Sequence, residues 1–350
     1  MATKRNDRRK PLSSSIIKLN KYISEELKID LVVKKKLGKG AFGVVYKGEY
    51  KGQTVAVKVE LSKKKDSLSK EFEIYRDLQL TSEDSTTSSS TNLPQCLYYS
   101  CQREYRILVI QMMGKNLEHI KDKVSKFSPI TTMNIACQML TLLKYIHSKG
   151  IVHKDIKPDN MVTFCDNGCG QGMISLLDFG MSTHYIGRDG KHIKNKDSKT
   201  IEGTIRYMSH HTHEGRKSSR RDDFQSLAYS LIYFLKGELP WQGLVVIKNN
   251  NNNKKGGGAR GEGKEQKELK KENRSENENA KRELIFKLKK EISTSELCKN
   301  LPPVFEKFLK YSNSLHFDEK PSYDDWRKLF FQEIKSLTEG NFMDYNLDWM

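Results

Sequence analysis

The sequence has no long hydrophobic run and few cysteines, and both absences exclude classes of protein. Within its 350 residues no stretch of about 18 uninterrupted apolar residues occurs, which argues against a membrane span. The six cysteines are scattered, unlike those of a small secreted domain held by disulfides. The opening segment also lacks the apolar core of a secretory signal. We therefore expect an intracellular protein, located in the cytoplasm, the nucleus or both.

Acidic residues are too few to balance the basic ones. The 44 Asp and Glu against 62 Lys and Arg give a formal net charge of +18, which favours polyanionic partners such as acidic or phosphorylated proteins. A charge-driven binding protein for nucleic acid would be one explanation. However, no basic motif with interleaved aromatic residues occurs, so nucleic acid is not a required partner.

The hydrophobic pattern changes along the chain. Residues 1–30 are polar and basic, and we expect them to be partly disordered with one short amphipathic helix. Residues 31–113 carry β-branched runs separated by glycine, which predict strands, and one helical segment at residues 70–80. Residues 114–350 follow a helical period, clearest at 131–149. This order predicts an α+β fold with a small β-rich N-lobe and a larger helical C-lobe.

Low-complexity segments interrupt this pattern. Residues 248–281 contain an Asn tract, a Gly tract and mixed charges with almost no apolar residues, so we expect a disordered insertion whose second half could be a solvated helix. Residues 82–91 are rich in Ser and Thr, which indicates a loop. Cys165 and Cys169 lack a second pair at metal-ligand spacing, so two free thiols in a loop are the favoured interpretation.

A glycine-rich segment between two predicted strands indicates a flap over nucleotide phosphates. Leu37-Gly38-Lys39-Gly40 continues to Gly43 and Val45, whereas a dinucleotide-binding fingerprint would lead from a strand into a helix. Lys58 follows in the next strand, where a lysine is typical of the group that holds the α- and β-phosphates. A helical glutamate should orient it. Both Glu71 and Glu73 are available, and Glu71 has the better spacing.

The most specific run is His153-Lys154-Asp155-Ile156-Lys157-Pro158-Asp159-Asn160, which is typical of a protein kinase catalytic loop. Asp155 would orient the hydroxyl of the substrate, and Lys157 would neutralise charge on the transferring phosphoryl group. Asn160 would hold a metal ion. The Asp178-Phe179-Gly180 motif follows an apolar run, and Asp178 would ligate Mg²⁺ because hard cations prefer carboxylate oxygens.

From residue 37 to residue 349 the chain resembles the casein kinase 1 family of protein serine/threonine kinases. The specific stretches are Gly203-Thr204-Ile205-Arg206-Tyr207, residues 219–223, residues 239–244 and residues 317–321. The resemblance implies that Thr204 bonds Asp155 and Lys157, and that the hinge at Gln111–Met113 bonds adenine. It assigns ATP contacts to Leu37, Gly38, Gly40, Gly43, Val45, Ala56, Lys58, Ile110, Gln111 and Met113.

The resemblance also implies acidic or phosphate-primed protein substrates. In the family a basic site on the C-lobe binds a phosphate already on the substrate, and Arg206 matches one of its members. The other members fall where the insertion stands, which leaves Lys248, Lys281 and Arg282 as candidates. Lys154 replaces the arginine that many kinases use to bind a phosphorylated activation loop, a phosphorylation that the family is understood not to need.

The expected function is therefore transfer of the γ-phosphate of ATP to Ser/Thr hydroxyls of proteins, with Mg²⁺ as metal and a monomeric chain. The alternatives are a pseudokinase-type scaffold and a charge-driven binding protein. The presence of Lys58, Asp155, Asn160 and Asp178 argues against a scaffold. A vaccinia-related kinase and a small-molecule kinase remain weaker alternatives.

Overall fold

The computed structural model describes residues 13–40, 43–63, 66–80, 92–164, 172–198, 200–244, 264–338 and 347–350, with side chains from residue 277 onward in the helix that begins at residue 264. The Ser/Thr-rich loop at 82–91, the Cys165 and Cys169 segment and the Asn and Gly tracts of the insertion lie outside the described residues. The chain divides into two compact units, Met1–Asn116 with Asn160–Ser182, and Leu117–Asp159 with Thr183–Met350.

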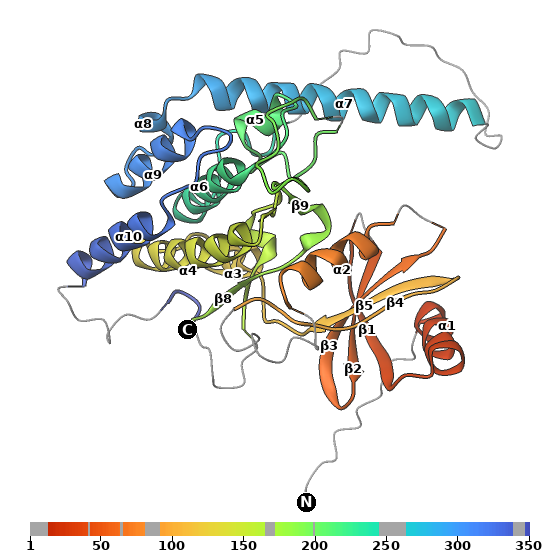
Figure 1. Ribbon diagram of the computed structural model, residues 1–350. Coiled ribbons are helices and arrows are strands. Elements are labelled where there is room, and N and C mark those ends of the chain that lie inside the picture. Colours follow the sequence, from red (N-terminus) through yellow and green to blue (C-terminus); the bar gives the residue numbers. More distant parts are fainter. Residues whose placement is uncertain are drawn as a thin grey trace, which may run out of the picture. The chain divides into compact units, whose positions relative to one another are not determined.

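The first unit is built on a five-stranded antiparallel sheet in the order β1-β2-β3-β5-β4 (Figure 1). The sequence predicts all five strands, because each carries β-branched or aromatic residues bounded by turn residues. The elements of this unit are α1 (Ser14–Tyr22), the π-helical turn η1 (Ile23–Leu27), β1 (Leu31–Gly40), β2 (Gly43–Tyr50), β3 (Gln53–Leu61), α2 (Leu68–Asp77), β4 (Cys96–Cys101), β5 (Tyr105–Gln111), β7 (Met161–Thr163), β8 (Ile174–Leu176) and the 3-10 turn η3 (Phe179–Met181).

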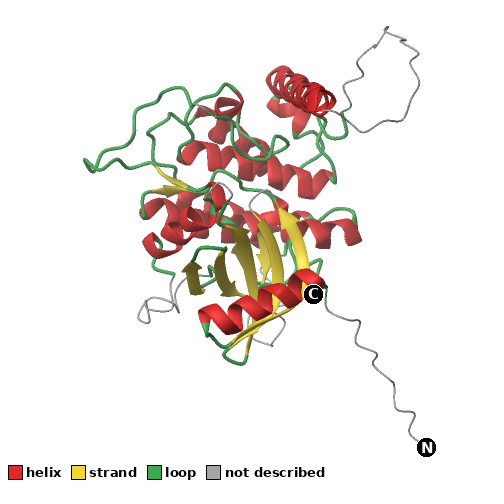
Figure 2. Cartoon of the chain, turned by 90° about the vertical axis from the view of Figure 1, so that its right-hand side faces the viewer, coloured by secondary structure: helices red, strands yellow, loops and turns green. Residues whose placement is uncertain are grey.

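Helix α1 lies across the sheet, and Figure 2 shows it in front of the strands. Its buried residues Ile16 and Leu19, with Ile23 of η1, join an apolar cluster with Val33 and strands β2, β3 and β5. Asn20 completes the attachment, because its amide donates to Val33 O (2.9 Å) and accepts from Val33 N (2.8 Å). The predicted amphipathic helix in residues 1–30 is therefore present and covers a face of the sheet.

The second unit is mostly helical. Its elements are α3 (Leu117–Val124), α4 (Pro129–Ser148), β6 (Ile151–Val152), β9 (Thr183–His184), α5 (His210–His213), α6 (Arg220–Lys236), α7 (Lys264–Glu291), α8 (Thr294–Leu297), α9 (Pro303–Ser314) and α10 (Tyr323–Leu337). The short 3-10 turn η2 (Pro158–Asn160) spans the boundary between the units. Helix α7 shows that the second half of the predicted insertion is helical, the option that the sequence left open.

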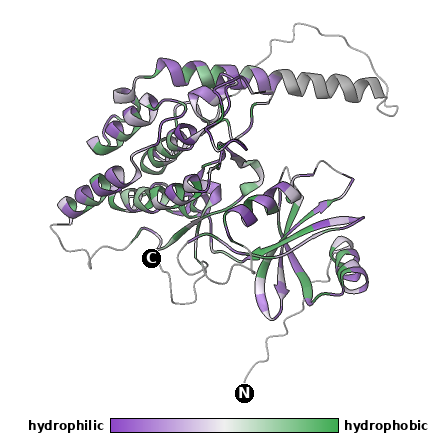
Figure 3. Ribbon diagram, in the orientation of Figure 1, coloured by the Kyte–Doolittle hydropathy of each residue, from purple (hydrophilic) through white to green (hydrophobic). Residues whose placement is uncertain are grey.

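The core of the second unit is formed by α4, α6, α9 and α10, which pack against one another. Figure 3 shows that hydrophobic residues are concentrated on the strands of the sheet and on α4 and α6. Helix α6 is buried along nearly its whole length, and the backbone N–H of its N-cap residue Ser219 donates to Asp222 Oδ2 (2.7 Å). A buried, capped helix of this kind is a rigid support for the loops that contact it. No helix in the described part of the chain is apolar over a length that would cross a membrane.

Candidate active site

The glycine-rich turn joins β1 to β2, as the sequence predicts. The pairing of β1 with β2 shifts register between Lys36 and Gly38, so Leu37 lies in a bulge. Leu37 is about half exposed (47%). Gly43 has a φ of +142°, and a Cβ there would collide with the backbone oxygen of Val59. Only glycine therefore allows β2 to begin this close to β3. Gly38 and Gly40 have open space around them, which suits a backbone that faces a ligand.

The predicted adenine contacts lie together on β3 and β5. Ala56 and Ile110 are direct partners across these strands, and both residues are buried. Gln111 ends β5 and pairs with Val55, and its backbone N–H donates to Gln95 O (2.9 Å). Met113 follows and is buried. Val45 on β2 is the partner of Lys58 on β3. The strand register therefore brings the predicted ATP-binding residues of β2, β3 and β5 next to one another.

Lys58 forms the charged centre of this unit. Its Nζ lies 2.5 Å from Glu71 Oε1 and 3.0 Å from Asp178 Oδ1. Burial alone would lower the pKa of the ammonium, but the two carboxylates outweigh burial and raise the pKa of Lys58. Glu73 instead pairs with Arg76 on the exposed face of α2. Of the two glutamates that the sequence left as candidates, Glu71 is the partner of Lys58, because it lies on the buried face of α2.

The two predicted metal ligands lie at one end of a short hairpin. Strands β7 and β8 pair antiparallel, with Met161 opposite Leu176, so Asn160 just before β7 and Asp178 just after β8 share that end. Leu177 N also donates to Asn160 O (2.8 Å). The two side chains offer an amide oxygen and a carboxylate, which fit a Mg²⁺ ion that takes most other ligands from phosphate and water. The described residues contain no cluster of three or more His, Cys, Asp or Glu that could hold a metal ion.

In the second unit, the predicted catalytic-loop residues Asp155 and Lys157 contact each other and Thr204. Asp155 Oδ1 accepts hydrogen bonds from the backbone N (3.0 Å) and the hydroxyl (2.7 Å) of Thr204. Asp155 Oδ2 lies 2.6 Å from Lys157 Nζ, which also donates to the Thr204 hydroxyl (2.9 Å). The predicted contact of Thr204 with both residues is present. Asp155 is nearly buried, so its orientation is fixed by these bonds.

Asp223 is a supporting residue to which sequence analysis assigned no role. From the buried helix α6, its two oxygens accept hydrogen bonds from His153 N (2.8 Å) and Lys154 N (2.8 Å). His147 also lies 2.9 Å from Asp223, and its other ring nitrogen lies 2.6 Å from the Tyr323 hydroxyl. Burial alone would raise the pKa of Asp223, but these hydrogen bonds outweigh it and lower the pKa. The residue thus stays ionised and holds the backbone that carries Asp155.

Lys154, which departs from the usual arginine, has an acidic partner in the chain. Its Nζ lies 2.6 Å from Glu202 Oε2, one residue before Gly203. The backbone of Lys154 is left-handed with a φ of +70°. In place of a phosphorylated residue, the segment thus supplies a carboxylate to the lysine of the catalytic loop. This is consistent with the expectation that no phosphorylation is needed there.

The predicted substrate phosphate site is only partly brought together. Arg206 Nη1 lies 3.7 Å from Glu118 Oε1 and 3.4 Å from the Tyr207 hydroxyl, and about a third of its side chain (34%) is exposed. Lys281 is exposed on α7, and Arg282 lies near enough to His213 to contribute to the lowered pKa of that histidine. Lys289 of α7, which the sequence did not single out, does contact the segment around Arg206.

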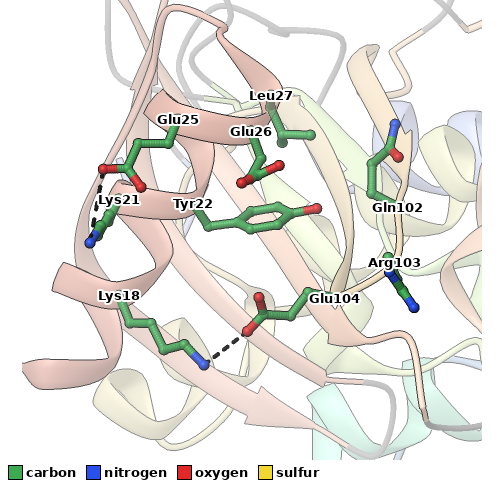
Figure 4. A pocket seen from close by; sticks show the side chains of 9 residues that line it. All are labelled: Lys18, Lys21, Tyr22, Glu25, Glu26, Leu27, Gln102, Arg103 and Glu104. Carbon is green, nitrogen blue, oxygen red and sulfur yellow. Dashed lines mark ion pairs between the residues drawn. The ribbon is translucent and has the colours of Figure 1, made fainter.

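A separate cavity of about 540 Å³ lies between α1, η1 and the turn that joins β4 to β5 (Figure 4). Figure 4 shows the Tyr22 ring across its middle, with Glu26 and Glu104 on either side. Its charges are largely paired with one another, since Lys18 lies 2.8 Å from Glu104 and Lys21 lies 4.0 Å from Glu25. None of the predicted ATP-binding residues lines this cavity.

Comparisons with known proteins agree with this geometry. A family model of the protein kinase domain matches residues 31–302. The casein kinase I homolog RAG8 of Kluyveromyces lactis is 33% identical over 90% of this chain and 52% of its own length. Casein kinase I homolog 1 of Saccharomyces cerevisiae is 34% identical over 90% of the chain and 52% of its own length, and casein kinase I homolog 2 of Schizosaccharomyces pombe is 34% identical over 91% and 65%. The chain thus spans between about half and two thirds of the length of these relatives. It belongs to the protein kinase family and, within that family, to the casein kinase 1 group.

Proposed function

We propose that the chain transfers the γ-phosphate of ATP to Ser or Thr hydroxyls of protein substrates. The observation that carries this proposal is the contact of Lys58 with both Glu71 and Asp178. A buried lysine between two carboxylates is oriented and charged, as a group that holds nucleotide phosphates must be. A scaffold without catalysis would not need this arrangement, so we do not favour that alternative.

The residues divide the chemistry between them. Lys58 would bind the phosphates of ATP beneath the glycine-rich turn, and Ala56 and Ile110 would enclose the adenine. Asp155 would receive or orient the hydroxyl proton of the substrate, because Thr204 and Lys157 fix both of its oxygens. Asn160 and Asp178 would hold Mg²⁺, which when bound neutralises charge on the phosphates.

The preference for acidic or phosphate-primed substrates rests on Arg206 and on the net charge of +18. Arg206 is the predicted reader of a substrate phosphate, but Glu118 lies 3.7 Å from it within the same unit. A bound phosphate would have to compete with this carboxylate, although an arginine can contact both. We therefore propose that priming is used but is weaker than it would be with an unpaired arginine. A monomeric chain and a cytoplasmic or nuclear location remain predictions.

Replacement of Asp178 tests the metal assignment. In Asp178→Asn we expect Mg²⁺-dependent phosphate transfer to casein to fall at least about a hundredfold, because the loss removes a charged metal ligand. The melting temperature should stay close to that of the wild type. As a control, Asp122→Asn changes an exposed aspartate of α3 and should keep full activity. Normal turnover by folded Asp178→Asn protein would refute the assignment.

A further inference from the structure

Lys289, in the last turn of α7, is a buried lysine that the proposed reaction does not use. The residue is only 2% exposed. Its Nζ donates to Ile205 O (2.9 Å) and Met208 O (2.7 Å) and lies 3.3 Å from His213 Nε2. It also lies 4.9 Å above the ring of Tyr229 and 5.1 Å above that of Trp241. Helix α5 packs against α7 at this place (Figure 1).

The two carbonyls belong to the segment at residues 204–208, whose backbone also bonds within itself, since Tyr207 N (2.9 Å) and Met208 N (3.0 Å) donate to Thr204 O. Thr204 is held by Asp155, as described above. Between the two carbonyls that Lys289 binds, Arg206 O accepts a hydrogen bond from Trp241 Nε1 (2.8 Å). The backbone from Thr204 to Met208 is therefore tied at one end to the catalytic loop. The carbonyls of Ile205 and Met208 are held by Lys289, and that of Arg206 is held by Trp241.

Burying the amine of Lys289 costs desolvation free energy, which its hydrogen bonds to the two carbonyls must offset. Burial lowers the pKa of Lys289 well below its ordinary value. In the described part of the chain no carboxylate forms an ion pair with it. Filling the same space with an apolar side chain would avoid the desolvation of the amine. However, an apolar side chain has no N–H for the two carbonyls. Even a neutral amine keeps two N–H donors, so these hydrogen bonds do not depend on its protonation state.

We propose that Lys289 is a positioning residue for protein substrates: it holds the carbonyls of Ile205 and Met208, and thereby keeps Arg206 between them at the surface for the substrate. The inference rests on the proposed kinase function, since it assigns a substrate-binding effect to that reaction. Because α7 directly follows the Asn- and Gly-rich tracts in the sequence, Lys289 also connects the helix of the insertion to the substrate segment. The residues proposed to bind ATP lie instead in the first unit.

The proposal separates binding of the peptide from binding of the nucleotide. In Lys289→Met, which keeps the length of the side chain but removes its donors, we expect the KM for a peptide substrate to rise about tenfold or more. The KM for ATP and the slow hydrolysis of ATP without peptide should stay within about twofold of the wild type. Lys289→Gln keeps an N–H donor and should recover part of the loss. Lys290→Met changes the neighbouring exposed lysine, which pairs with Glu214 (3.0 Å), and should behave as the wild type.

Trp241→Phe provides a second route if Lys289→Met does not fold. It removes the indole N–H that holds Arg206 O while it keeps an aromatic ring in the same place, and it should raise the peptide KM severalfold with the ATP KM unchanged. A peptide KM within twofold of the wild type in folded Lys289→Met or Trp241→Phe would overturn the proposal. A parallel loss of ATP hydrolysis in these variants would overturn it too, because it would indicate a general structural role. Absence of transfer by the wild-type chain would instead refute the proposed function.

Discussion

Removal of the negative charge of Glu71 should impair catalysis much more than it impairs stability. Glu71→Gln keeps the size of the side chain, and among the residues that the structure describes it leaves Lys58 with one charged partner, Asp178, at 3.0 Å. Breaking a buried ion pair costs about 3–5 kcal/mol when a charge is left uncompensated. Here Asp178 compensates the lysine, so we expect a loss in the free energy of unfolding of about 1.5–3 kcal/mol, the range for a hydrogen bond to a charged group.

The catalytic effect is larger because Lys58 would be drawn to Asp178 instead of being held between two carboxylates. Loss of one correctly placed electrostatic group typically lowers kcat by about 10²–10³. The assay is phosphate transfer from ATP to a peptide under saturating Mg²⁺, combined with thermal melting. Because one kcal/mol shifts the melting temperature by only about 2–4 °C in a large domain, the variant should remain folded at assay temperature.

Glu73→Gln is the matched control, since Glu73 lies on the same helix but pairs with Arg76 at an exposed position. Exposed pairs contribute about 0–1 kcal/mol, so neither activity nor melting should change measurably. A kcat/KM of Glu71→Gln within about threefold of the wild type would refute the reasoning, as would an equal loss in Glu73→Gln.

Three further predictions concern the N-terminal helix, the pH dependence of stability and the substrate site. Leu19→Ala should lower the free energy of unfolding by about 2–5 kcal/mol in denaturant titration, because Leu19 is buried under the sheet; exposed Ile17→Ala should not. Burial lowers the pKa of His213 to about 3, so below pH 6.5 this histidine takes up a proton in the unfolded chain but not in the folded one. Between pH 6.5 and 5 this difference should lower the free energy of unfolding by about 2 kcal/mol. Burial raises the pKa of Asp222 to about 6, so its protonation adds stability as the pH falls through 6 and offsets part of this loss; His213→Gln should therefore flatten the fall in melting temperature, and an unchanged pH profile would contradict it. Arg206→Ala should lower the ratio of transfer to a phosphoserine-primed peptide over an unprimed one severalfold, whereas Glu118→Gln should raise it, and equal ratios in both variants would exclude Arg206 as the reader.

Local sequence patterns predicted the elements well because they depend on neighbouring residues. The β-branched runs around Val45, Val57 and Val109 become β2, β3 and β5, and the apolar period at residues 131–149 becomes α4. Lys58, Asp155 and Asp178 could be identified because each lies within a short motif with fixed spacing. The spacing already favoured Glu71 over Glu73, and the structure agrees with this choice, because Glu71 lies on the buried face of α2 and contacts Lys58.

Contacts between distant residues could not be predicted in the same way. Asp223 holds the backbone of His153 from a helix about 70 positions away, and within the sequence it is one of several acidic residues beside a basic run. Lys289 appears in the sequence as one lysine of a strongly charged helix, so an exposed position would be expected. Its burial follows from the packing of α7 on α5 and α6, where Tyr229 and Trp241 surround its side chain. The sequence feature that points to burial of this helix end is the run of three apolar residues Leu284, Ile285 and Phe286, which indicates that the end of α7 packs against other elements.

The most direct measurement is transfer of radiolabelled phosphate from ATP and Mg²⁺ to two peptides, one acidic and one with a phosphoserine shortly before the target serine, by the wild type and by Asp155→Asn. Asp155 should be essential, because Thr204 and Lys157 fix both of its oxygens in the catalytic loop. We expect labelled phosphoserine in at least one peptide with the wild type, and a loss of about a thousandfold or more in Asp155→Asn. Equal labelling by the folded variant, or no labelling by wild-type protein that binds ATP, would contradict the proposed kinase function.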